Sequence, residues 1–135
     1  MKRKVYIHGQ MPETWEPALD ALAEDLQMVP DADGLEIRCT KGEALAVESD
    51  GHSVTLTWSA PVEFYRALSL IPHPLVPCSI YEKARFQTAG VMFDCSRNAV
   101  LTPEAMRFFL RKMALMGLSM GMLYTEDTYE VPEQP

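Results

Sequence analysis

The sequence has no long apolar run and few basic residues, and each absence argues against a class of protein. No apolar stretch reaches the roughly 18 residues that a membrane-spanning helix needs. Met1 is followed by charged residues and then by a strand-like segment, and not by the apolar core of a secretory signal. The formal net charge is −7, and Lys2-Arg3-Lys4 is the only basic run, which argues against a nucleic-acid-binding surface. We therefore expect a cytoplasmic protein that binds neither membrane nor nucleic acid.

Cysteine and histidine are also scarce, with three residues of each type. The cysteines are Cys39, Cys78 and Cys95. Their spacing matches no zinc-ligand pattern, and an odd number leaves one thiol over in any disulfide scheme. The histidines form no metal-ligand pair at helical spacing. We expect ordinary reduced thiols, no metal and no cofactor.

The composition is that of a folded protein, since 47% of the residues are hydrophobic and 23% are charged. A chain of 135 residues can form one domain, or a small domain and part of another. It is too short for a closed barrel of eight strands and eight helices, which needs about 250 residues.

The first part of the chain alternates strands and helices. Residues 4–9 and 35–39 have the alternating apolar pattern of strands. Between them, apolar residues at spacings of three and four predict an amphipathic helix over 15–26, with Thr14 at its N-cap. Two further strands, 45–48 and 53–58, flank an Asp-Gly turn. We expect the last three strands to form a meander.

A second helix is predicted from Pro61 to Ile71, with Ser59 as its N-cap. The prolines of residues 72–77 then form a stiff connector, and 79–88 is expected to be extended. These elements predict an α+β fold in which a small antiparallel or mixed sheet carries both helices on one face. We assign residues 1–86 to this first, accessory domain.

The pattern changes at Gly90. Val91-Met92-Phe93 is a continuous apolar run, typical of a strand buried on both faces. A helix follows, with Thr102 as N-cap and Gly117 as its stop. The helix has an apolar stripe that predicts core packing, formed by Met106, Phe109, Leu110, Met113 and Ala114. The next apolar run is Met120–Tyr124, which completes a strand-helix-strand unit with parallel strands.

Two parallel strands alone leave unpaired edges and an uncovered helix face. We therefore interpret residues 87–135 as the opening of a truncated (β/α)8 barrel, and expect that the exposed edges could lead to self-association.

Charged residues follow both strands, where the reactive face of a barrel lies. Asp94 and Arg97 come after the first strand, and Glu126 and Asp127 after the second. They suggest either recognition of substrate hydroxyl groups or structural ion pairs, between Asp94 and Arg97 or across to Glu126. Adjacent residues on an extended chain point to opposite sides, so Glu126 and Asp127 are unsuited to act as a glycosidase carboxylate pair. We predict substrate binding by these four residues and no catalytic residue.

Three segments resemble the start of the catalytic barrel in family-20 glycoside hydrolases, the β-N-acetylhexosaminidases. They are Gly90–Asn98, the helix that begins at Thr102-Pro103, and Leu123–Tyr129. Gly90, Asp94 and Arg97 resemble the first barrel strand of that family, and the last segment resembles a bacterial branch. The residue before Gly90 is Ala89, whereas the family usually has an arginine there that grips sugar hydroxyls.

The resemblance implies retaining, substrate-assisted removal of terminal β-linked N-acetylhexosamine. In that mechanism the substrate's acetamido group attacks the anomeric carbon, an aspartate positions this group, and the neighbouring glutamate protonates the leaving oxygen. The family carries that pair after a later barrel strand, so we expect this fragment to be inactive by itself. Two alternatives stay open: a stand-alone carbohydrate- or partner-binding module, and a different barrel enzyme, such as another glycosidase.

Overall fold

The computed structural model describes residues 2–97 and 100–126, which form two sheets and three helices. The strands are β1 (Arg3–Gly9), β2 (Met28–Pro30), β3 (Leu35–Lys41), β4 (Leu45–Asp50), β5 (Val54–Trp58), β6 (Pro77–Glu82), β7 (Gly90–Asp94) and β8 (Met120–Tyr124). The helices are α1 (Trp15–Leu26), α2 (Pro61–Leu70) and α3 (Pro103–Leu115). No helix in the described residues is long and apolar enough to span a membrane.

The larger sheet has six strands in the order β2-β1-β3-β5-β4-β6. β1 runs parallel to β2 and β3, and β3 runs parallel to β5. β4 is antiparallel to β5 and to β6. The sheet is therefore mixed, which is one of the two forms that the sequence predicted, and β6 belongs to it.

The predicted meander of β3, β4 and β5 is wrong, because β5 lies between β3 and β4. Apolar alternation fixes which face of a strand is buried, but it does not choose the neighbouring strand. The central place of β5 leaves Val54 and Leu56 at most 1% exposed. The short strand β2 was missed because it follows α1 with only Gln27 between them and spans three residues.

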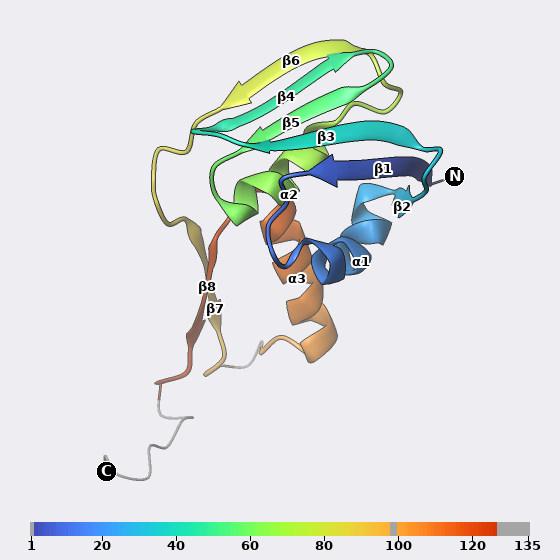
Figure 1. Ribbon diagram of the computed structural model, residues 1–135. Coiled ribbons are helices and arrows are strands. Elements are labelled where there is room, and N and C mark those ends of the chain that lie inside the picture. Colours follow the sequence, from blue (N-terminus) through green and yellow to red (C-terminus); the bar gives the residue numbers. More distant parts are fainter. Residues whose placement is uncertain (1, 98–99, 127–135) are drawn as a thin grey trace.

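Helices α1 and α2 lie against the same face of the six-stranded sheet (Figure 1), which confirms the predicted α+β fold. Leu19 and Leu22 of α1 and Phe64 and Leu68 of α2 are buried there. They meet the inward side chains of the strands in one continuous core.

Two helix starts differ in detail from prediction. Thr14 occupies the N-cap position of α1, as predicted, but its side chain makes no capping hydrogen bond. The N-cap of α2 is Ala60, so the prediction of Ser59 was wrong by one residue. The carboxylate of Glu63 explains the difference, since it accepts hydrogen bonds from the Ser59 hydroxyl (2.6 Å) and the Ala60 amide (3.3 Å).

Strands β7 and β8 form a separate two-stranded parallel sheet joined through α3, as predicted. The Thr102 hydroxyl accepts a hydrogen bond from the Ala105 amide at 3.2 Å and caps α3. At the other end, Gly117 takes a left-handed φ of 79°, which ends the helix where the sequence indicated.

The predicted burial of this unit is only partly present. Phe93 is 7% exposed, but Val91 and Met92 are 39% and 61% exposed, so β7 is not buried on both faces. Of the apolar stripe on α3, only Met113 is buried. The physical reason is that, within the described residues, β7 and β8 pair with no other strand.

Candidate functional site

Charged and hydroxyl side chains meet at the carboxyl ends of β7 and β8. The two strands are in register from Gly90 and Met120 to Asp94 and Tyr124, so both ladders end at the same level. The amide of Cys95 donates to the Tyr124 carbonyl at 2.7 Å and continues the pairing by one residue. The residues that follow each strand are thereby brought together, as expected for parallel strands.

Asp94 is fixed by the turn that follows β7. Its Oδ1 accepts hydrogen bonds from the Ser96 amide at 2.9 Å and the Ser96 hydroxyl at 2.7 Å. The hydroxyl bond, then the amide bond, and the nearby charge of Arg97 hold the pKa of Asp94 below its usual range. Asp94 is thus a carboxylate acceptor at neutral pH and is unsuited to donate a proton.

Arg97 lies between two carboxylates. Its Nη1 is 3.7 Å from Asp94 Oδ2, and its Nη2 donates to Glu126 Oε1 at 3.4 Å. Both ion pairs that the sequence suggested are therefore present. The Arg97 side chain is nevertheless 71% exposed, so its guanidinium group is accessible to solvent or a ligand.

Glu126 is held from a second side by Tyr124, whose hydroxyl donates to Glu126 Oε1 at 2.8 Å. This bond raises the pKa of Tyr124, and desolvation and the charge of Asp94 act in the same direction. Glu126 itself has a positive φ of 42°. Of the four predicted site residues, three meet here, and Asp127 lies outside the described residues.

The cluster, formed by Asp94, Ser96, Arg97, Tyr124 and Glu126, combines carboxylate acceptors with a guanidinium donor. Such groups suit the recognition of hydroxyl groups, because a hydroxyl can donate to a carboxylate and accept from an arginine. Within residues 2–97 and 100–126, no group of three or more His, Cys, Asp or Glu side chains could hold a metal ion.

A cavity of about 580 Å³ lies elsewhere, at the amino ends of β7 and β8. Its lining includes Arg66 of α2 and Glu82 of β6. Phe86, Ala89 and Ser119, which lie near the starts of β7 and β8, also line it. It is therefore at the opposite end of the strand pair from Asp94 and Glu126.

No protein-family profile matches the chain, and a search of curated proteins finds no match. Solved structures do share its fold. The exo-β-N-acetylglucosaminidase of family 20 from Vibrio harveyi, solved with N-acetylglucosamine, aligns with a TM-score of 0.69 and 19% identity over 91% of this chain. A mutant β-hexosaminidase from Streptomyces plicatus, in complex with its product, aligns with a TM-score of 0.66 and 15% identity over 90% of this chain.

A family-138 enzyme that targets pectin rhamnogalacturonan II also aligns over 90% of the chain, with a TM-score of 0.54 and 13% identity. The fold occurs in glycoside hydrolases. At these identities the likeness establishes the fold, and the chain covers only 22% and 30% of the two family-20 structures and 18% of the family-138 structure.

Proposed function

We propose that this chain is the first part of a glycoside hydrolase that removes terminal β-linked N-acetylhexosamine. In this proposal residues 1–86 form an accessory domain and residues 87–135 open a (β/α)8 barrel. The observation that carries the proposal is the parallel unit β7-α3-β8, with a polar cluster where both strands end. Barrel enzymes place their reactive groups at these strand ends.

The uncovered apolar surface supports the barrel. Parallel strands are normally buried on both faces, yet both strands and α3 leave large apolar side chains in solvent. These side chains include Val91, Met92, Phe108, Phe109, Leu110, Met120, Met122 and Leu123. Further strands and helices of a barrel would cover such a surface, and a chain without them would associate through it.

Within this proposal Asp94, Arg97, Glu126 and Asp127 bind the sugar. Asp94 supplies a carboxylate acceptor for a hydroxyl group, since its pKa is lowered by Ser96. Arg97 supplies solvent-exposed donors beside it. The chemistry would be substrate-assisted, with the acetamido group of the sugar as nucleophile. This mechanism also needs an aspartate and a glutamate, which we expect after a later barrel strand and not among the four binding residues. We therefore expect the 135-residue chain to be inactive alone.

The test is hydrolysis of a chromogenic β-N-acetylglucosaminide by this chain and by a form extended through a complete barrel. Only the extended form is expected to release the chromophore. Turnover by the 135-residue chain would contradict the proposal that the catalytic pair lies downstream. Inactivity of both forms would favour a binding module or another glycosidase, and the fold shared with the family-138 enzyme supports the second of these alternatives.

The sugar-binding role is tested in the extended form with Asp94→Asn. A hydrogen bond to a charged group contributes about 1.5–3 kcal/mol, so kcat/KM is expected to fall about 10- to 100-fold. Glu104→Gln is the matched control, because Glu104 is 78% exposed and pairs only loosely with Arg107, at 3.6 Å on the surface of α3. Equal kcat/KM for the wild type and Asp94→Asn would show that Asp94 does not bind the sugar.

A further inference from the structure

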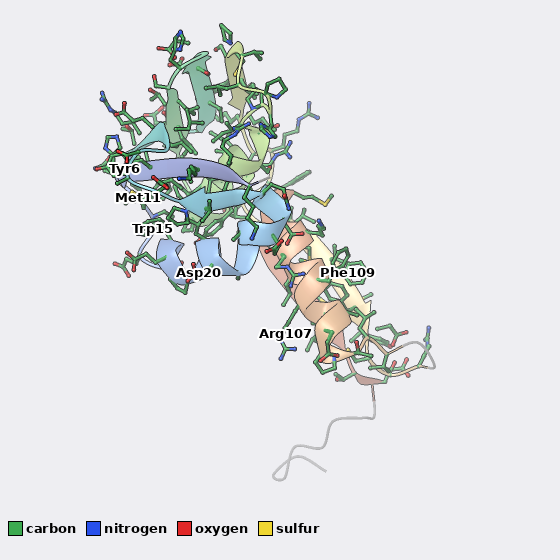
Figure 2. The ribbon with its side chains drawn as sticks, turned by 90° about the vertical axis from the view of Figure 1, so that its right-hand side faces the viewer. Tyr6, Met11, Trp15, Asp20, Arg107 and Phe109 are labelled. Carbon is green, nitrogen blue, oxygen red and sulfur yellow. The ribbon has the colours of Figure 1, made fainter. Side chains whose placement is uncertain are left out.

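The polar cluster at the ends of β7 and β8 is connected to the six-stranded sheet mainly through α3. The ring of Phe93 on β7 lies 5.9 Å from that of Phe109 on α3. Side-chain atoms of Leu110 and Met113 approach the position of a Cβ at Gly121 on β8 at 3.7 and 3.9 Å. Figure 2 shows Phe109 on one side of α3 and Arg107 on the other. The helix in turn contacts α1 and α2.

One carboxylate makes the polar contact between α1 and α3. Asp25, near the end of α1, accepts from Arg111 Nε at 2.8 Å and from Lys112 Nζ at 2.7 Å, one on each oxygen. Its side chain is only 11% exposed. The hydrogen bond from Lys112, followed by that from Arg111, outweighs burial and holds the pKa of Asp25 below its usual range.

The carboxyl end of α3 is held as well. The Leu115 carbonyl accepts from Ser69 Oγ at 3.0 Å and from Arg66 Nη1 at 3.5 Å, both on α2. Arg66 also donates to both carboxylate oxygens of Glu82, at 3.1 and 2.9 Å. The last two turns of α3 are therefore attached to α1, α2 and β6.

We propose that Asp25 is a positioning residue for the cluster at the carboxyl ends of β7 and β8, and that it acts through α3. The proposal rests on the proposed function for the role of that cluster. It concerns a residue of α1 that does not belong to the cluster itself.

Because α3 is anchored at its carboxyl end, a small rotation there displaces its amino end. The helix has 13 residues, and at about 1.5 Å per residue it is roughly 20 Å long. Figure 1 shows that α3 points away from the six-stranded sheet, with its amino end toward the same end of the molecule as the carboxyl ends of β7 and β8. A rotation of about 5° around the anchored end would move the other end by about 2 Å. Displacements of about 1 Å are enough to weaken a catalytic arrangement strongly.

Apolar packing cannot set this angle alone. Contacts such as those of Met113 are non-directional and allow small rotations. Two charge-assisted hydrogen bonds to the two oxygens of one carboxylate are directional. Asp25 thereby fixes both the rotation of α3 relative to α1 and the position of α3 along its axis.

The native cysteines allow a direct measurement on the 135-residue chain. Cys78 lies in the six-stranded sheet and Cys95 directly follows Asp94, and both are partly exposed. Burial raises the pKa of Cys39 to about 12, so this thiol will resist labelling. Spin labels on Cys78 and Cys95 then report the distance between the sheet and the cluster without any added mutation.

We expect one narrow distance distribution in the wild-type chain and a distribution broadened by several ångströms in Asp25→Asn. The substitution keeps the shape of the side chain but places an amide donor against a cationic donor. Asp25→Glu retains both oxygens and should keep the distribution narrow. The matched control is Glu24→Gln, because the neighbouring Glu24 pairs with Lys2 while its side chain is 79% exposed. An unchanged distribution in a folded Asp25→Asn chain would overturn the proposal.

A second measurement separates this inference from the proposed function. In the form extended through the barrel, Asp25→Asn is expected to lower kcat/KM about tenfold, while Glu24→Gln has no effect. Broadened distances with unchanged kcat/KM would overturn the positioning role. If the extended wild type cleaves no hexosaminide, the proposed function fails, and the distance measurement still decides whether Asp25 positions the cluster.

Discussion

Replacing Phe64 by alanine is expected to lower the free energy of unfolding by roughly 3–5 kcal/mol. The Phe64 side chain is fully buried, with edge-to-face contacts to Trp58 and Tyr65 at ring centroid distances of 6.2 and 5.4 Å. Alanine would remove these contacts and leave a cavity between α2 and the sheet. Because domains are stable by only about 5–15 kcal/mol, the variant would be close to unfolding. Denaturant titration of the chain measures the change.

Phe86→Ala is the matched control for this prediction. Phe86 is 75% exposed in the segment between β6 and β7, so removing its ring leaves no cavity. Its effect should stay within about 0.5 kcal/mol. Similar losses for the two variants would mean that Phe64 does not anchor the core as described.

Gly90→Ala is expected to separate β7 from β8 at their first pair. A Cβ at Gly90 would lie 1.9 Å from the carbonyl oxygen of Met120, and this backbone atom cannot rotate away. The ladder would have to shift, at a cost of about 1–3 kcal/mol or more. Hydrogen exchange should show lost amide protection in β7 and β8, with little change in β3 and β5.

The control for this variant lies on the partner strand. A Cβ at Gly121 would meet its nearest side-chain atoms at 3.7–3.9 Å, which is ordinary contact. Gly121→Ala should therefore leave the exchange pattern unchanged. Protection that survives in Gly90→Ala would show that the two strands can pair without this close approach.

Much of the secondary structure could be predicted because it depends on local signals. Thr102, Pro103 and Gly117 bound α3 as the capping rules require. The sheet order could not be predicted in the same way, since alternation in β3, β4 and β5 is compatible with several neighbours. Consecutive strands are neighbours only about two-thirds of the time.

The candidate site was accessible to sequence reasoning because its position follows from topology. Asp94 and Arg97 follow one parallel strand and Glu126 the next, so they were expected to lie close together. Asp25 carried no such signal. It lies 86 residues before Arg111, and no local pattern joins a carboxylate on α1 to cations on α3.

The place of β5 between β3 and β4 also suggests an order of assembly for the sheet. The β4-β5 hairpin closes a very short loop, in which Asp50 accepts from the Ser53 and His52 amides, so its entropic cost is small. β3 and β1 must then add on the far side of β5 through parallel pairing, which requires longer closures. We therefore expect the sheet to grow outward from this hairpin, with amides of β4 and β5 protected first in pulsed exchange during refolding.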